Sequence, residues 1–352
     1  MITRRVFATM LGATLGRGIR AQNRPQVTDR PAGSADLPTA IAGPPSAIAL
    51  VLAPSNLGLR PENGRQPGTW GAPQALMEAG LADALRPVEV VRLARPRYEF
   101  DAQSGTRIRN GKSIRAFSLQ LAATLRRALV SAQFPVVIGG DCSILLGSLH
   151  GLRLAGGRGL VHVDGHSDFS HPGNYNSKVV LGAAAGMDLA LATGRGEALL
   201  TSWPQVGTPL AQDADVVQIG ERSSGDPAFM KYYGDVFDTQ ITMITVQRVH
   251  AGGVAAAARQ AIARLAEREL RRAWLHVDLD VLDQAVMPAV DSTGTPGFDY
   301  AQLATLVAML RASGRIAGIN FSIYDPERDP DRRYARELVR CIAESLSRKE
   351  AA

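Results

Sequence analysis

Three short segments of this sequence combine carboxylate, imidazole or thiol side chains at close spacing. They are Gly-Gly-Asp-Cys-Ser at 139–143, Asp-Gly-His-Ser-Asp at 164–168 and Asp-Leu-Asp-Val-Leu-Asp at 278–283. Alternate residues of an extended segment point the same way, so Asp164, His166 and Asp168 can converge on one side, as can Asp278 and Asp280. Each motif alone is more often a strand-end turn, a helix cap or a buried core residue. The three together favour a functional site.

A cluster of four carboxylates in a buried cleft points to bound metal ions, because unneutralised carboxylates repel one another strongly. One imidazole with several carboxylates suits Mn²⁺, Fe²⁺ or Zn²⁺ better than copper. The thiol of Cys142 brings the set to more ligands than a single ion usually takes. The sequence therefore predicts two divalent cations.

The elements that must position these motifs alternate along the chain from residue 46 onward. Short apolar runs that predict strands lie at 47–52, 88–91, 135–138, 160–163, 215–219, 241–245, 273–277 and 316–322. Amphipathic stretches that predict helices lie at 72–85, 114–131, 253–271, 300–312 and 332–346. This alternation predicts a three-layer α/β fold, with about eight mainly parallel strands and helices on both faces. Ligands collect at the carboxyl ends of such strands, where the three motifs lie.

The composition excludes several classes of protein. Of 352 residues 45% are hydrophobic, which is typical of a globular chain, and no apolar run approaches the roughly 20 residues of a membrane-spanning helix. Two cysteines are too few for a disulfide scaffold or a zinc module of four thiolates. The net charge is +6, but six arginines and one acid in residues 1–30 supply +5 of it. We therefore expect no nucleic-acid partner.

The first 45 residues indicate export rather than a folded element. Arg4-Arg5 precedes a short, weakly apolar stretch, which resembles a twin-arginine signal peptide over 1–21. A basic N-terminus without this role is the alternative. Residues 22–45 are rich in Pro, Gly, Ala and Ser and predict a flexible linker, and 46–352 predict a single domain. We expect a periplasmic protein without a stable membrane anchor.

The motifs together resemble the arginase/agmatinase (ureohydrolase) family, whose members hydrolyse guanidino compounds with two manganese ions. Residues 139–143 are similar to the family's Gly-Gly-Asp-His-Ser, and 164–168 to its Asp-Ala-His-x-Asp. Residues 278–283, with Ser-Thr-Gly-Thr-Pro at 292–296, are similar to its Asp-x-Asp-x-x-Asp block and the following Gly-Thr-Gly-Thr-Pro. The resemblance covers nearly the whole chain after the linker and implies an arginase-like fold.

The resemblance also implies roles for individual residues. Cys142 and Asp168 would hold one ion, His166 and Asp280 the second, and Asp164 and Asp278 would bridge the two. A hydroxide between the ions would attack the carbon of the planar C–N group of a small-molecule substrate. We expect Asp168, Asp283 and His171 to take part in catalysis and Ser177 and Asp325 to contact the substrate. The resemblance implies a homo-oligomer, either a trimer or a hexamer.

Three departures from the family pattern bear on activity. Cys142 replaces a histidine ligand, as in the hydroxyarginine amidinohydrolases of cycloserine biosynthesis, and a thiolate shifts the expected metal from Mn toward Zn or Fe. Leu181 falls where the family has a proton-relay histidine, for which His171 or solvent would have to substitute. Ile323 falls at the guanidinium-binding glutamate, which Asp325, Glu327 or Glu221 would have to replace. A catalytically impaired relative that only binds metal or ligand is the alternative function.

Overall fold

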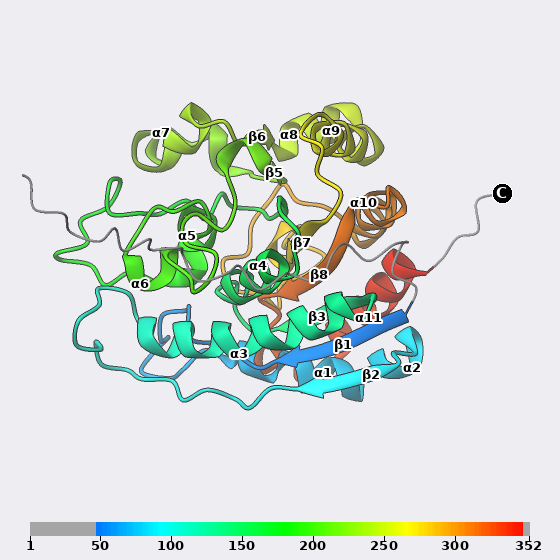
Figure 1. Cartoon of the computed structure of the whole chain (residues 1–352), viewed down its shortest axis with the longest axis horizontal. Helices are drawn as coiled ribbons and strands as arrows, with labels where there is room; N and C mark the ends of the chain where they lie inside the picture. Colours follow the sequence, from blue (N-terminus) through cyan, green and yellow to red (C-terminus); the bar gives the residue numbers. More distant parts are fainter. Residues whose placement is uncertain (1–46, 348–352) are drawn as a thin grey trace, which may run out of the picture. The chain divides into compact units, whose positions relative to one another are not determined.

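A computed structural model describes residues 47–347, which form one parallel sheet covered by helices (Figure 1). The expected signal peptide and linker lie outside the described residues. The strand order is β2-β1-β3-β8-β7-β4-β5-β6, and every neighbouring pair is parallel. The strands are β1 (Ala47–Ala53), β2 (Glu89–Arg92), β3 (Gln133–Gly139), β4 (Leu160–Val163), β5 (Val216–Ile219), β6 (Thr242–Ile244), β7 (Ala273–Asp278) and β8 (Ile316–Ser322). The eight-stranded α/β fold predicted from the sequence is confirmed.

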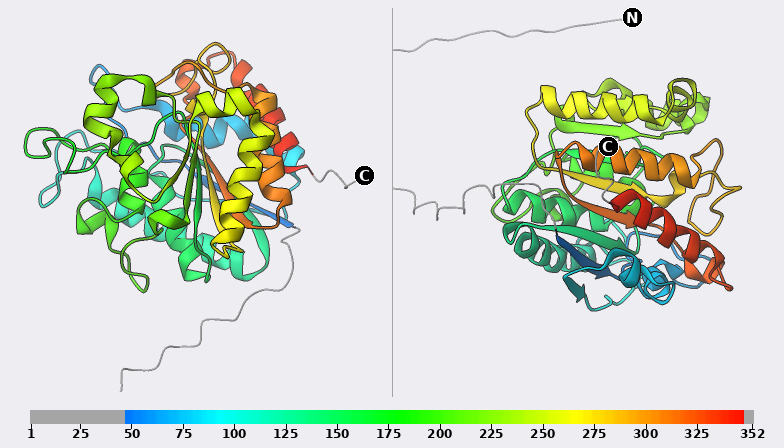
Figure 2. Two further views of the ribbon diagram at one scale, coloured as in Figure 1. Left: turned by 90° about the horizontal axis from the view of Figure 1, so that it is seen from above. Right: turned by 90° about the vertical axis from the view of Figure 1, so that its right-hand side faces the viewer.

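Helices cover both faces of the sheet, as Figure 2 shows from above. One face carries α1 (Ala72–Glu78), α2 (Leu81–Leu85), α8 (Val246–Gly252), α9 (Val254–Glu267), α10 (Tyr300–Ala312) and α11 (Arg333–Leu346). The other carries α3 (Gly111–Val130), α4 (Ile144–Leu154), α5 (Asp188–Ala192) and α6 (Ala198–Thr201). The short α7 (Pro227–Tyr233) precedes β6. Apolar side chains fill both interfaces, since alternate residues of each central strand point to opposite faces.

The helices differ from the predicted ones at Gly80, at α4 and at the short helices α5 to α8, which were not predicted. The stretch expected as a single helix at 72–85 is broken at Gly80, whose φ of 95° ends α1 and begins α2. The helix α4 was not predicted, because it is buried along nearly its whole length and has no polar face to reveal its period. Gly147 and Gly151 allow α4 to approach α3 closely. A Cβ at Gly147 would lie 2.9 Å from the Ser118 backbone.

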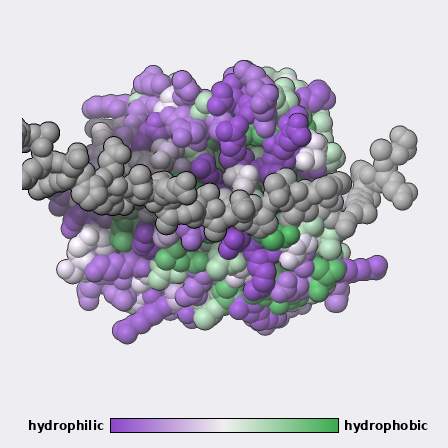
Figure 3. All heavy atoms as spheres, viewed as in Figure 1, coloured by the Kyte–Doolittle hydropathy of each residue, from purple (hydrophilic) through white to green (hydrophobic). Residues whose placement is uncertain are grey.

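On the face shown in Figure 3, hydrophilic side chains predominate and hydrophobic ones occur in separate patches. No helix within 47–347 is both long and apolar enough to cross a membrane. The central strands β3, β8, β7 and β4 instead lead to a polar cluster at their carboxyl ends.

Candidate metal centre

The structure brings the six expected metal ligands together at the carboxyl ends of β3, β4 and β7. The ligand atoms of Asp164, His166 and Asp168 lie within 4.8 Å of one another, and so do those of Asp164, Asp278 and Asp280. The sulfur of Cys142 lies within the same distance of a carboxylate oxygen of Asp278, and Asp164 belongs to two of these groups. The sequence therefore identified a real spatial cluster.

The same local hydrogen bond sets the orientation of the motif that follows β4 and of the one that ends β7. After β4, the carboxylate of Asp164 accepts a 2.6 Å bond from the backbone N–H of His166. At the end of β7, the carboxylate of Asp278 accepts a 2.7 Å bond from the backbone N–H of Asp280. Such aspartate turns redirect the chain while holding the carboxylate at the strand end. They leave the second side chain of each motif facing its counterpart, with His166 Nδ1 2.8 Å from Asp280 Oδ2.

The cluster is poorly neutralised without a cation. Burial, reinforced by neighbouring carboxylates, raises the pKa of Asp164, Asp168 and Asp278 well above its ordinary value. Burial and the charge of Asp278 likewise raise the pKa of the Cys142 thiol. Oδ2 of Asp164 is buried and has no hydrogen-bond partner. Buried polar atoms are rarely left without a hydrogen-bond partner. The cluster of carboxylate, imidazole and thiol groups therefore fits divalent cations, whose positive charge would take the place of the protons on these groups.

Asp280 is the exception in the cluster. Burial alone would raise its pKa, but His166 and the guanidinium of Arg222 outweigh burial and lower it. Nη2 of Arg222 lies 3.2 Å from Asp280 Oδ1, and both side chains are almost fully buried. Asp280 is therefore held as a carboxylate before any cation binds.

A second buried layer, which sequence analysis did not identify as a unit, lies beneath the ligands. His162 and His276 are register partners on β4 and β7, and their rings stack with centroids 4.8 Å apart. Nε2 of His162 is 3.3 Å from Oδ1 of Asp188, the first residue of α5. Burial lowers the pKa of His162 to about 3 and of His276 to about 4, and raises that of Asp188 to about 7. The sequence did hold a signal for this layer, because each histidine lies two residues before an expected ligand, His162 before Asp164 and His276 before Asp278.

The hydrogen bonds behind His276 determine its tautomer. The indole N–H of Trp274 donates to Oδ1 of Asn320 at 2.7 Å, so the amide of Asn320 faces His276 with its nitrogen. That nitrogen donates to Nδ1 of His276 at 2.8 Å. The proton of the neutral ring therefore resides on Nε2, which lies 3.6 Å from Oδ2 of Asp188. Within residues 47–347 both of these atoms lack a hydrogen-bond partner, since 3.6 Å is too long for a hydrogen bond. A ligand atom of His276 also lies within 4.8 Å of those of Cys142 and Asp278.

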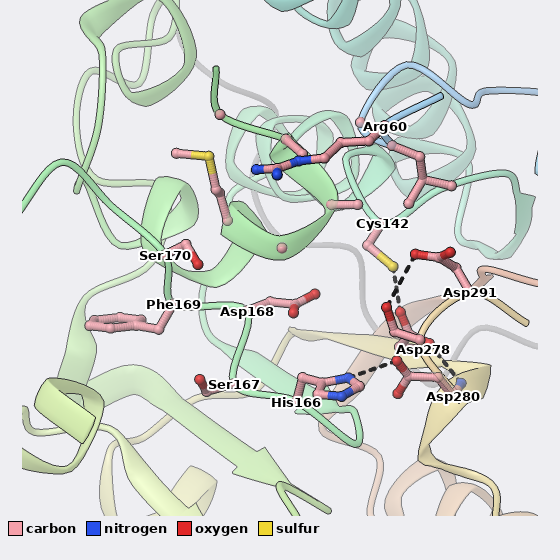
Figure 4. A pocket seen from close by; sticks show the side chains of 18 of the residues that line it. Arg60, Cys142, His166, Ser167, Asp168, Phe169, Ser170, Asp278, Asp280 and Asp291 are labelled. Atoms are coloured by element: carbon pink, nitrogen blue, oxygen red, sulfur yellow. Dashed lines mark hydrogen bonds and ion pairs between the residues drawn. The ribbon is translucent and has the colours of Figure 1, made fainter. Parts of the chain in front are cut away.

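A cavity of about 570 Å³ opens onto the cluster (Figure 4). Five of the six expected ligands line it, namely Cys142, His166, Asp168, Asp278 and Asp280. Asp164 lies beneath them and is fully buried. Such an arrangement admits a small molecule to one side of a metal centre.

Comparison with known proteins decides the family. A family model described as "Arginase family" matches residues 46–347. The chain belongs to the arginase family. It is 29% identical over 252 residues to an arginase of Bacillus caldovelox, which covers 70% of this chain and 80% of that protein. It is also 29% identical over 310 residues to a formimidoylglutamase of Aeromonas hydrophila, covering 84% and 85%.

Solved structures of arginase-family proteins share the fold. The native Bacillus caldovelox arginase superposes with a TM-score of 0.72 at 26% identity, covering 87% of this chain and 99% of that one. A formimidoylglutamase of Bacillus subtilis superposes with a TM-score of 0.62 at 16% identity, covering 87% and 88%. Family membership confirms the expected class, a metal-dependent hydrolase of non-peptide C–N bonds.

Four residues that the family resemblance suggested for catalysis or substrate contact do not line this cavity. Nε2 of His171 lies 2.7 Å from Asp235, and the carboxylate of Asp283 accepts from Thr295 and from two backbone N–H groups of its own loop. The carbonyl of Ser177 accepts from Arg107. Asp325 accepts from the backbone of Glu327 and lies near Arg328. The expected roles of His171, Asp283, Ser177 and Asp325 stay predictions.

The two positions where the resemblance implied a missing glutamate and histidine, Ile323 and Leu181, bring no polar side chain to the cavity. Ile323 lines the cavity and is 3% exposed, at a φ of 76° that is unusual for a β-branched residue. Neither Glu221 nor Glu327 lines the cavity in its place, and the carboxylate of Glu221 is bonded to Ser223 and Ser224. Leu181 does not line it, whereas residues 182, 183, 185 and 186, all glycine or alanine, do. This segment brings no titratable side chain to the cavity.

Proposed function

We propose that this protein hydrolyses a C–N bond of a guanidino or related amidine- or amide-like small molecule with two divalent cations. The observation that carries the proposal is the sharing of Asp164 between two groups of ligand atoms, because a shared carboxylate is what two adjacent ions require. In this assignment Cys142 and Asp168 would hold one ion, His166 and Asp280 would hold the other, and Asp164 and Asp278 would be shared by both. Manganese is the metal of the family resemblance, and zinc or iron is the alternative that a thiolate favours.

The chain's own residues prepare the site for this chemistry. When bound, the cations would supply a water that ionises near neutral pH and would polarise the substrate. The turns after β4 and β7 hold the carboxylates in place, and the His166–Asp280 bond orients the imidazole. The leaving amine needs a proton. Residues 182–186 are all glycine or alanine and have no group that could donate one. Solvent in the cavity is the proton source in this proposal.

A relative that binds metal or ligand without turnover is the second candidate. One observation favours it. Ile323 and the glycine and alanine residues of 182–186 form the cavity wall where a guanidinium-binding carboxylate and a proton-relay histidine are expected. Both substitutions would affect turnover or substrate recognition, while five of the six metal ligands keep the residue type that the resemblance implies and Cys142 supplies a thiol in place of the sixth. The two candidates therefore agree on metal binding and differ on catalysis.

The test is a substrate panel on protein of measured metal content. Full-length protein loaded with Mn²⁺, Zn²⁺ or Fe²⁺ is assayed with arginine, hydroxyarginine, agmatine, 4-guanidinobutyrate and N-formimidoyl-L-glutamate. The last compound is included because two relatives are named formimidoylglutamase. Release of urea, formamide or ammonia is measured. Turnover of any compound supports the hydrolase, and silence across the panel with every metal supports the binding-only relative.

We also propose export to the periplasm through the twin-arginine motif and assembly into a trimer or hexamer. The first proposal rests on the sequence of residues 1–21 and the second on the family resemblance alone. Analytical ultracentrifugation of the purified protein measures the assembly.

A further inference from the structure

We propose that the cavity selects substrates that carry an anionic group, and that Arg60 binds this group across from the metal ligands. The inference rests on the proposed function, since it names the substrate class of the same cavity. Arg60 lies on the loop that follows β1 and is the only lysine or arginine among the cavity-lining residues. Figure 4 shows its guanidinium on the opposite side of the cavity from His166 and Asp280.

The guanidinium of Arg60 lacks a carboxylate partner. Its one hydrogen bond runs from Nη2 to the backbone oxygen of Leu181 at 3.4 Å, and within residues 47–347 it makes no ion pair. A guanidinium carries five N–H donors in a planar fork that matches a carboxylate. Most of these donors are therefore available to a bound molecule.

The acidic residues at the cavity rim are already paired with a different arginine. Nη2 of Arg328 lies 2.8 Å from both carboxylate oxygens of Glu62 and 4.0 Å from Asp291. Glu62 and Asp291 line the cavity, so they could have neutralised Arg60 but do not. Arg60 is exposed, lines the cavity and keeps its positive charge without a carboxylate partner among the cavity-lining residues.

A cationic substrate would find no charged partner at Ile323 in the cavity wall. Ile323 offers a guanidinium neither charge nor a hydrogen bond, and a buried cation without a partner is costly. A substrate whose hydrolysable group is planar and whose other end is a carboxylate fits both features. The class comprises neutral ureido or amide groups joined to a carboxylate.

Binding of matched probe pairs to the metal-loaded, full-length protein tests this assignment. Calorimetry compares 4-ureidobutyrate with uncharged 4-ureidobutanamide, and 4-guanidinobutyrate with agmatine. The variants are Arg60→Gln, Arg60→Lys and the control Arg65→Gln. Arg65 lies on the same loop, is 79% exposed, pairs with Glu327 and does not line the cavity. Melting temperatures establish that each variant is folded.

We expect each carboxylate probe to bind at least about tenfold more tightly than its partner, and Arg60→Gln to weaken it by about tenfold to hundredfold. Arg60→Lys should retain part of the preference, and Arg65→Gln all of it. Equal binding within both pairs, no binding of either carboxylate probe, or an unchanged preference in Arg60→Gln would overturn the inference.

The same experiment separates this inference from the proposed function. An Arg60-dependent preference for carboxylates without hydrolysis of any compound would support the anion site and contradict the hydrolase. Hydrolysis of cationic guanidines that is unchanged in Arg60→Gln would support the hydrolase and contradict the anion site.

Discussion

Raising the pH should destabilise the metal-free protein in a range where most globular proteins change little. Asp164, Asp168 and Asp278 have pKa values well above the ordinary one because they are buried together, so the folded protein keeps protons that the unfolded chain has released. Stability then falls as the pH rises toward the folded-state pKa. The raised pKa of His166, caused first by Asp280, acts in the same direction above about pH 6.5.

The buried histidines confine this prediction to neutral and higher pH. His162 and His276 have lowered pKa values, about 3 and about 4, so they oppose the effect only while the unfolded chain still protonates them, below their ordinary value of 6.5. Asp188, whose pKa is about 7, also keeps its proton in the folded protein and adds to the loss of stability up to that pH. Between about pH 6.5 and 8 the decline is therefore unopposed within the cluster.

The size of the effect follows from proton linkage. Each proton that the folded protein keeps and the unfolded chain has released costs about 1.4 kcal/mol of stability per pH unit, so a single proton kept throughout this range would cost about 2 kcal/mol. For roughly 300 folded residues this lowers the Tm by about 3 °C. Bound cations replace the protons and need ionised ligands, so added Mn²⁺ or Zn²⁺ should reverse the slope.

Differential scanning calorimetry of chelator-treated and metal-loaded protein at the two pH values measures both effects. Asp278→Asn is the matched variant, because its amide cannot hold the proton and its slope should be shallower. Equal melting temperatures of the metal-free protein at both pH values, or a slope that metal leaves unchanged, would refute the reasoning.

Asp278→Ala should lose both ions, because it removes a ligand shared by the two. Elemental analysis that still finds two equivalents of metal would contradict the ligand assignment. Cys142→His should shift the metal preference toward manganese, since imidazole is less soft than thiolate and removes one negative charge. Competition between Mn²⁺ and Zn²⁺ measures this shift, and an unchanged ratio would show that Cys142 is not a ligand. Arg4→Lys with Arg5→Lys should retain the precursor in the cytoplasm, which fractionation measures. Unaltered export would exclude the twin-arginine route.

Most of the fold could be predicted from local patterns. The central strands were recognisable as short apolar runs, because strands buried on both faces need no polar alternation, whereas the edge strand β2 alternates between half-buried and exposed residues. The helix α4 was not predicted, because burial on all sides removes the amphipathic period by which a helix is recognised. The chain reversal at Gly80 could not be distinguished from a tolerated glycine within one long helix.

The metal ligands were predictable because strand ends and two-residue spacing are local features. What the sequence could not provide was the relation between segments far apart in the chain. Asp188 joins His162 and His276 only through the register of β4 with β7 and the position of α5. Arg60 reaches the cavity from a loop about 80 residues before the first ligand. His171, close to Asp168 in sequence, turns away to Asp235 after the positive φ of Asp168.

The hydrogen-bonded relay from Trp274 through Asn320 to His276 has a consequence for how the protein chooses its metal. One nitrogen of the His276 ring accepts from Asn320 and the other carries the proton, so the ring would have to give up one of these to bind a cation. A ligand atom of His276 nevertheless lies within 4.8 Å of those of Cys142 and Asp278. The effect of an exchange at position 142 on metal selectivity therefore depends on the protonation of His276 as well as on the side chain that replaces the thiol.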